Sequence, residues 1–270
     1  AGLSAKFSFL YNVGIPLGEI LFHGCDGFYQ FLVVCHNCFS FLCDMLILKA
    51  HQDIVATENE GKIAAVLSIE GAEQIEDIDS AYARGVRIAY LTWNHDNLLC
   101  GAAMDGGTGL TNKGRQFVMR AQELGIMLDM SHISERGFWD TLEISTRPVI
   151  AGHSNSKAVC NVPRNLSDEQ FLALVRQGGG AGINLYPKFL GLGRNIDAVF
   201  AHIEHFMSLG GEKSVFLGCD LDGIEEMPRG ISGVQDLGRI YETLLRHNYS
   251  EQLVCDIFRN NILKVMEKAL

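Results

Sequence analysis

Proline and basic residues are both scarce in this sequence. Only five prolines occur in 270 residues, and no low-complexity tract or block of charge divides the chain, so nothing predicts a domain boundary. We therefore expect residues 1–270 to form one domain. Lys and Arg number 22 against 32 Asp and Glu, which gives a formal net charge of -10. An acidic surface of this kind argues against nucleic acid or an anionic membrane as a partner.

Long uninterrupted apolar runs are also missing. The most apolar stretch, residues 27–48, is broken by four polar residues, Gln30, His36, Asn37 and Asp44, which favours a buried strand followed by a helix over a membrane span. The sequence opens without a basic region followed by a sustained apolar one, so no signal peptide is predicted. The eight cysteines lie mostly in apolar surroundings without a repeating spacing, which is typical of reduced, cytosolic chains. We therefore predict a cytoplasmic protein.

What the sequence does contain is an alternation of strand-like and helix-like segments. Short apolar runs predict six strands, at residues 62–69, 86–93, 126–130, 148–152, 180–186 and 214–219. Apolar residues at helical spacing predict helices at residues 112–125, 134–145, 167–179 and 196–211. Two C-terminal helices are expected at residues 234–246 and 250–270. One or two more strands fit at residues 7–11 and 28–34.

This alternation predicts the class of fold. Strands that alternate with helices of this length imply parallel strands joined by right-handed crossovers. Seven or eight strands in a chain of this length favour a closed barrel, so we predict an α/β fold, a (β/α)8 barrel of the TIM type. The alternative, an open doubly wound sheet, predicts a glycine-rich phosphate loop after its first strand, and no G-x-G-x-x-G or Walker sequence occurs there.

Residues that can bind a metal or move a proton follow five of the predicted strands: Glu70, His95, His132, His153 and Asp220. In a barrel of this type the C-terminal ends of the strands form the active site. A single histidine at a strand end is more often structural, but five such residues at one rim are much harder to attribute to chance. Imidazole and carboxylate suit zinc, which lowers the pKa of bound water to about 7 and polarises a carbonyl. The pattern therefore indicates hydrolysis of an amide or an ester.

An arginine and an aspartate extend this candidate site. Arg164 follows His153 by 11 positions and could bind a substrate carboxylate through two parallel N–H bonds. The alternative interpretation of Arg164 is a salt bridge within a loop. Asp220 is expected to hold or accept the proton of the attacking water.

The segments around these residues form a recognisable set. They occur in order over residues 61–270 and include LSIEGAE, RIAYLTWNHDN, GLTNKGRQFV, LGIMLDMSHIS, PVIAGHSNSKAVCNVPRNLSDEQ, GGGAGINLY and LGCDLDGIEEMPRGI. Together they resemble the membrane (renal) dipeptidases, peptidase family M19. The resemblance implies a (β/α) barrel of the metal-dependent hydrolase type that holds two zinc ions and cleaves free dipeptides through a metal-activated water. It also implies a homodimer.

The resemblance assigns roles to the candidate metal ligands. Glu70 matches the carboxylate that bridges the two metals, and His132 and His153 match the two histidines of the second metal. The separation of 21 residues between these histidines is what one helix between neighbouring strands requires.

Four further residues receive roles in substrate binding and proton transfer. By resemblance, His95 matches the histidine that contacts the substrate and the developing oxyanion, and Arg164 matches the arginine that contacts the substrate. Asp220 matches the aspartate that acts as acid and base. Tyr186, at the end of another predicted strand, is expected to line the pocket.

One departure from the family pattern concerns the first metal. The family carries a His-x-Asp pair on its first strand, whereas the H-x-D of this sequence, at His51–Asp53, lies outside both early strands expected at residues 7–11 and 28–34. The segment KFSFLYN, which ends at Asn12, is the expected position of that strand. The departure predicts a first strand that is missing or diverged, one firmly bound zinc ion and a weak or empty second site.

Three functions follow as alternatives. The first is a zinc metallopeptidase that acts on dipeptides. The second, supported by the lack of a His-x-Asp pair on the expected first strand, is a catalytically weak homologue that binds a ligand without turnover. The third is another metal-dependent barrel amidohydrolase, acting on a lactone, an ester or a cyclic amide. The third predicts a lysine bridge between metals, whereas Glu70 occupies that position here, which favours the first.

Overall fold

Two parallel sheets carry the fold. The computed structural model describes residues 32–33, 45–50, 52–59 and 63–270. The larger sheet has six strands that pair in sequence order: β4 (Leu67–Glu70), β5 (Val86–Tyr90), β6 (Met127–Asp129), β7 (Ile150–Ala151), β8 (Gly180–Ile183) and β9 (Val215–Leu217). The smaller sheet has the order β1 (Leu32–Val33), β3 (Ile63–Ala65), β2 (Met45–Ile47). Only Val66 separates β3 from β4, so the two sheets are joined along the chain.

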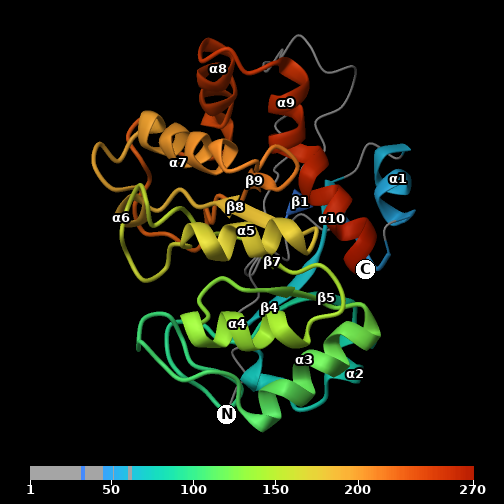
Figure 1. Ribbon diagram of the computed structural model, residues 1–270. Coiled ribbons are helices and arrows are strands. Elements are labelled where there is room, and N and C mark those ends of the chain that lie inside the picture. Colours follow the sequence, from blue (N-terminus) through green and yellow to red (C-terminus); the bar gives the residue numbers. More distant parts are fainter. Residues whose placement is uncertain (1–31, 34–44, 51, 60–62) are drawn as a thin grey trace.

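Helices connect the strands of the larger sheet and lie around it (Figure 1). Those between its strands are α2 (Ile78–Ala83), α3 (Asn112–Leu124), α4 (Glu135–Ile144), α5 (Asp168–Arg176), α6 (Pro187–Leu190) and α7 (Ile196–Ser208). After β9 come α8 (Gly238–Arg246), α9 (Glu251–Cys255) and α10 (Asn261–Ala269), with a π-helical segment, Asp256–Asn260, between the last two. Helix α1 (Gln52–Asn59) precedes β3. This repeat of strand and helix, with strands paired in chain order, is the arrangement of a (β/α) barrel.

Local sequence signals determine where several helices begin and end. The Thr111 hydroxyl accepts a backbone N–H at 3.0 Å and begins α3, and Gly125, with φ of 82°, ends it. The Ser167 hydroxyl and the Gln170 side chain form a reciprocal capping box at α5. Such side chains satisfy N–H groups that have no partner inside the helix. The caps predicted at Ser134 and Ser167 are confirmed.

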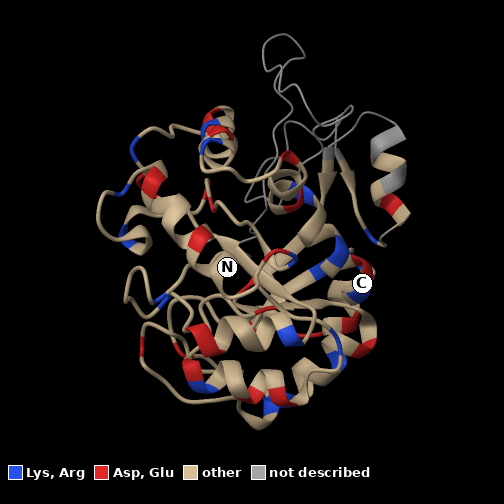
Figure 2. Cartoon of the chain, turned by 45° about the horizontal axis from the view of Figure 1, so that its top comes forward, with Lys and Arg blue, Asp and Glu red and all other residues tan. Residues whose placement is uncertain are grey.

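The strand side chains alternate between two apolar layers, as the period of a β-strand requires. One layer contains Val66, Ile88, Met127, Ile150 and Phe216, which pack with residues of α10. The alternate strand residues pack in a second cluster with the surrounding helices. Charged residues lie mainly on the helices and loops outside these layers (Figure 2). Because α10 packs near the beginnings of the strands, their C-terminal ends are left for a functional site.

The predicted α/β fold of parallel strands is confirmed, with differences at particular elements. All six strands expected after residue 61 are present, although the first is divided at Val66 into β3 and β4. The helix expected towards the end of residues 27–48 is wrong at Met45–Ile47, because these residues pair with β3 as strand β2. Within the strand expected at residues 28–34, Leu32–Val33 form β1. The strand expected at residues 7–11, and Asn12 beside it, lie outside the described residues.

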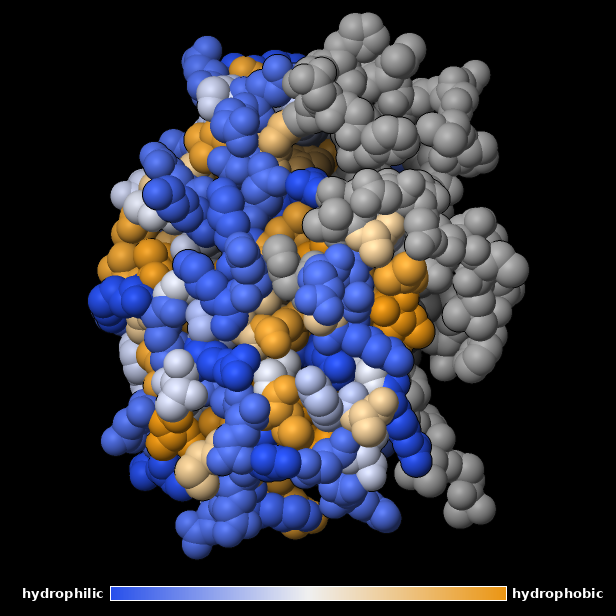
Figure 3. Space-filling model, turned by 90° about the vertical axis from the view of Figure 1, so that its right-hand side faces the viewer, coloured by the Kyte–Doolittle hydropathy of each residue, from blue (hydrophilic) through white to orange (hydrophobic). Residues whose placement is uncertain are grey.

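The described surface and cysteines bear on the predicted cell compartment. No helix of the described residues is long and apolar enough to cross a membrane. The described part of the face in Figure 3 is largely hydrophilic, with apolar residues in small separate areas. Cys100, Cys160 and Cys219 are free, whereas Cys255 is disulfide-bonded. The expectation of reduced cysteines is therefore wrong at Cys255, because an apolar sequence context does not decide which sulfur atoms the fold brings together. The cytoplasmic location stays a prediction.

Candidate metal centre

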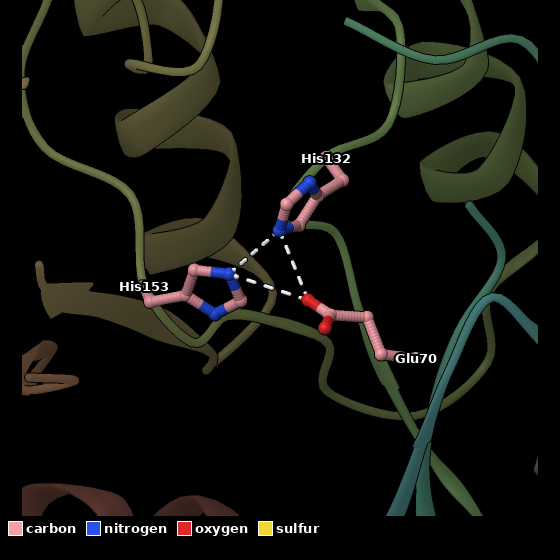
Figure 4. Close-up of side chains that lie close together, drawn as sticks. All are labelled: Glu70, His132 and His153. Carbon is pink, nitrogen blue, oxygen red and sulfur yellow. Dashed lines mark hydrogen bonds and ion pairs between the residues drawn. The ribbon is translucent and has the colours of Figure 1, made fainter. Parts of the chain in front are cut away.

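Three side chains from three strand ends point toward one another (Figure 4). Glu70 is the last residue of β4, His132 follows β6 by three positions and His153 follows β7 by two. Because these strands are parallel, their C-terminal ends lie at the same edge of the sheet. His132 Nε2 lies 2.9 Å from Glu70 Oε1, His153 Nε2 lies 3.6 Å from the same oxygen, and the two Nε2 atoms are 2.9 Å apart.

Burial sets the charge of the two histidines. No more than 10% of any of the three side chains is exposed. Burial lowers the pKa of His132 to about 4, although the carboxylate of Glu70 opposes the shift. Burial, and then the neighbouring His132, lowers the pKa of His153 well below its ordinary value. Both imidazoles are therefore neutral at pH 7, which is the form that binds metals.

This donor set fits a divalent metal ion. The three ligand atoms all lie within 4.8 Å of one another. Two neutral imidazoles and one carboxylate form the protein ligands of several catalytic zinc sites, which keep a position open for water. Their chemistry and spacing make Glu70, His132 and His153 candidate metal ligands. The alternative interpretation is a carboxylate that is hydrogen-bonded to a pair of histidines without a metal.

The backbone is in an uncommon conformation at two predicted site residues. Four non-glycine residues in the described part of the chain have positive φ, and two of them are His132 (71°) and Asp220 (57°). The left-handed region is unfavourable for residues with a Cβ atom, and such strain concentrates at functional sites. The sequence gives no direct signal of this conformation.

Asp220 lies three residues beyond β9 and is oriented by an asparagine. Its Oδ2 atom accepts a hydrogen bond from Asn184 Nδ2 at 3.2 Å. Asn184 in turn accepts one from Tyr186 N at 2.6 Å, and its backbone N–H donates to Asn155 Oδ1 at 2.9 Å. Burial, and then the charge of Glu70, raises the pKa of Asp220 to about 7. A carboxyl group with this pKa can both release and accept a proton near neutral pH.

Arg164 is buried near these carboxylates. The side chain lies on the ring of Phe189, with 5.5 Å from guanidinium carbon to ring centroid, and only 4% of the residue is exposed. Its Nε and Nη2 atoms have no hydrogen-bond partner among the described residues. Burial lowers the pKa of Arg164, and the carboxylates of Glu70 and Asp220 oppose the shift. A buried donor without a partner is costly, so this guanidinium would gain from an anionic ligand.

A cavity of about 900 Å³ opens beside the cluster. His132, Ser154 and Arg164 are among the residues that line it, and α4 contributes Phe138 and Trp139. Concave sites of this size with apolar walls and a few polar groups are typical of small-molecule binding.

The structure does not bring His95 or Tyr186 into the cluster. The His95 side chain is 80% exposed, and its Nδ1 atom lies 3.2 Å from Asp105 Oδ1. Tyr186 is partly buried at the start of α6, where its ring packs on Phe189 with centroids 4.9 Å apart. The roles of both residues stay predictions.

Three polar residues of the site did not emerge from the sequence. Asp129 and Ser131 hold the backbone around the two histidines, and Asn184 holds Asp220. Asn184 could have been found, since it follows the apolar residues of β8 directly. Asp129 gave no signal, because a single aspartate inside an apolar run reads as part of the strand.

Comparison with known proteins shows which family this chain belongs to. The sequence model of the membrane dipeptidase family, peptidase family M19, matches residues 30–270. An uncharacterized protein in the pqqA 5′ region of Klebsiella pneumoniae is 33% identical over 233 residues, which cover 80% of this chain and 85% of that protein. The chain therefore belongs to the membrane dipeptidase family, and the resemblance seen in the sequence is confirmed.

Two further relatives are longer than this chain. Both are uncharacterized dipeptidases of Schizosaccharomyces pombe, 32% and 34% identical over 75% and 81% of this chain. The matched parts cover 52% and 56% of those proteins, so the chain spans about half their length.

Solved structures match the fold over most of the chain. A metallo peptidase from Rhodobacter sphaeroides, liganded with a phosphinate mimic of the dipeptide L-Ala-D-Ala, has a TM-score of 0.79 at 27% identity, over 84% of this chain and 69% of that one. The M19 metallo peptidase dipeptidase AC also has a TM-score of 0.79 at 27% identity, over 84% of this chain and 72% of that one. These matches confirm the predicted TIM-type fold. They make the chain a homologue of metallo-dipeptidases with a candidate metal site.

Proposed function

We propose that this chain is a metal-dependent dipeptidase that hydrolyses the peptide bond of free dipeptides. The observation that carries the proposal is the meeting of Glu70, His132 and His153, with neutral imidazoles, in a member of family M19. These residues would hold zinc, which when bound supplies an activated water and polarises the scissile carbonyl. We propose one firmly held ion and a weaker second site, because the expected first strand, residues 7–11, carries no His-x-Asp.

Arg164 and Asp220 supply the remaining chemistry in this proposal. The unpartnered N–H groups of Arg164 bind the C-terminal carboxylate of the substrate. Such recognition places the scissile bond one residue before the C-terminus of the substrate, and the limit of two residues is supported by the family to which the chain belongs. Asp220, with its pKa of about 7, takes the proton of the attacking water and returns it to the leaving amine. The dipeptide mimic on the Rhodobacter sphaeroides relative supports this substrate class.

His95 and Tyr186 complete the proposed pocket. Tyr186 lines it, and His95 contacts the oxygen on which negative charge develops. Because the His95 side chain is 80% exposed, the loop between β5 and α3 has to turn inward when substrate binds. Its pair with Asp105 is exposed, and pairs of this kind oppose such a movement only weakly.

The test is turnover of dipeptides and matched tripeptides with added zinc, for wild type, Asp220→Asn and Asp222→Asn. Asp222 lies in the same loop and gives a matched control, because its loss removes the same charge two residues from Asp220. We expect cleavage of dipeptides and not tripeptides, a loss of at least about 10²-fold in Asp220→Asn, and near wild-type rates in Asp222→Asn. Equal rates for wild type and Asp220→Asn contradict the mechanism.

Two other outcomes select the alternative functions. A wild-type chain that binds zinc and cleaves no dipeptide is the homologue that binds without turnover. A chain that cleaves only lactones, esters or cyclic amides is an amidohydrolase of another substrate class.

We further propose a single domain over residues 1–270, a cytoplasmic location and a homodimer. Light scattering of the purified protein tests the dimer.

A further inference from the structure

A buried carboxylate lies between the two turns that carry the histidines. Asp129, the last residue of β6, is 2% exposed. Its Oδ1 atom accepts hydrogen bonds from Ser131 N and from Gly152 N, each at 2.9 Å. Ser131 precedes His132 in the chain and Gly152 precedes His153. One oxygen atom therefore joins the backbones of both turns.

The backbone ladder between the strands ends before it reaches these turns. β6 and β7 share one register pair, Asp129 with Ile150, because β7 is only two residues long. A last backbone bond runs from Met130 N to Ile150 O at 2.6 Å. Beyond it, side chains replace the ladder: besides the Asp129 carboxylate, the Ser131 hydroxyl accepts a bond from His153 N at 3.0 Å.

The turn after β7 approaches this carboxylate too closely for any residue but glycine. A Cβ atom at Gly152 would lie 2.0 Å from Asp129 Oδ2, well inside van der Waals contact. The two imidazole rings beyond it have centroids 5.0 Å apart. A shift of either turn would therefore change the spacing of the two histidine donor atoms.

We propose that Asp129, assisted by Ser131, is the positioning residue that sets the separation of His132 and His153 and thereby the affinity of the metal centre. The inference rests on the proposed metal site. Among the described residues, the metal-binding group contains Glu70 and the two histidines and not Asp129, so Asp129 acts through the turns. Metal ions tolerate donor distances only within a few tenths of an ångström. Groups that orient ligands typically contribute 10–100-fold in metal affinity.

A matched control lies at the opposite end of the same two strands. Gln122 is 4% exposed, and its Oε1 atom accepts bonds from Thr146 N at 2.5 Å and Arg147 N at 3.1 Å. Thr146 and Arg147 lead into β7, and Gln122, near the end of α3, leads into β6. Truncation of Gln122 removes as many bonds to backbone N–H groups as truncation of Asp129, away from the histidines.

The experiment measures zinc affinity by competition with a chromogenic chelator, with circular dichroism as the check of folding. The variants are Asp129→Ala, Asp129→Asn and Gln122→Ala. Asparagine keeps an oxygen that can accept both N–H groups, whereas alanine keeps none. We expect Asp129→Ala to bind zinc about 10–100-fold more weakly, and the other two to stay within about threefold of wild type. Ser131→Ala, a milder change, should weaken binding by about fivefold.

Each result decides the inference. Wild-type zinc affinity in a folded Asp129→Ala variant overturns the inference. A loss of zinc affinity in Asp129→Asn as large as that in Asp129→Ala also overturns it, because the charge of Asp129 and not the position of the turns would then matter. An equal loss in Gln122→Ala also overturns it, since the effect would be general. If Asp129→Ala does not fold, unchanged affinity in Ser131→Ala overturns it. These results leave the metal site itself intact, whereas a wild-type chain that binds no zinc overturns both proposals.

Discussion

Zinc affinity should fall little between pH 7 and pH 5. A protonated imidazole cannot bind a metal, so protons compete with zinc once the pH approaches the pKa of the ligand. A histidine with the ordinary pKa of about 6.5 is only about 3% neutral at pH 5, which lowers affinity by about 30-fold. Burial lowers the pKa of His132 to about 4, so this histidine stays about 90% neutral at pH 5 and lowers affinity by about 1.1-fold. The pKa of His153 shifts in the same direction and adds no loss.

A chelator competition assay at each pH, with the chelator's own affinity known at that pH, measures this effect. Circular dichroism at the same pH values shows whether the fold persists. We expect a change of less than about threefold between pH 7 and pH 5. A loss of about 30-fold or more in a folded protein would refute the argument that burial keeps the imidazoles neutral.

Two further predictions concern the core and the substrate loop. Phe206→Ala should lower the free energy of unfolding by about 3–5 kcal/mol, because this ring is fully buried and stacks on Phe171 with centroids 4.1 Å apart. Chemical denaturation measures the change, and a loss below about 1 kcal/mol contradicts it. Asn165→Ala should raise KM more than it lowers kcat, because Asn165 Nδ2 donates to Cys160 O at 2.8 Å and to Phe189 O of α6 at 2.9 Å and so fixes the loop that carries Arg164. Steady-state kinetics on a cleaved dipeptide measure both constants, and an effect confined to kcat contradicts this role.

Apolar periodicity and helix signals were enough to predict most of the sheet. The six runs after residue 61 became strands because short apolar segments bounded by glycine and serine have few other ways to be buried. The break at Val66 and the strand at Met45–Ile47 could not be predicted in this way. Both depend on pairing between β2 and β3, and a strand without an alternating pattern cannot be told from a buried helix by period alone.

Some features of the site could also be predicted from the sequence, and others could not. The meeting of Glu70, His132 and His153 could be predicted because a residue at the end of a short strand, or within three positions of it, has little freedom to leave the rim. His95 follows β5 by five residues, so loop contacts decide its direction, and Tyr90 occupies the strand end with its ring 5.5 Å from that of His153. The role of Asp129 depends on contact with the backbone N–H of Gly152, 23 residues further along the chain, which no local pattern encodes.

The three candidate ligands would also link distant parts of the chain. Glu70, His132 and His153 are separated by 62 and 21 residues, so one ion held by all three closes two loops. In an unfolded chain both closures carry an entropic cost, and zinc therefore binds the folded form in preference. By mass action, free zinc at 100 times its Kd would add about 2.7 kcal/mol to the free energy of unfolding. The ion proposed to act on the substrate would thus serve as a reversible cross-link, and the thermal stability of the protein would follow the supply of zinc.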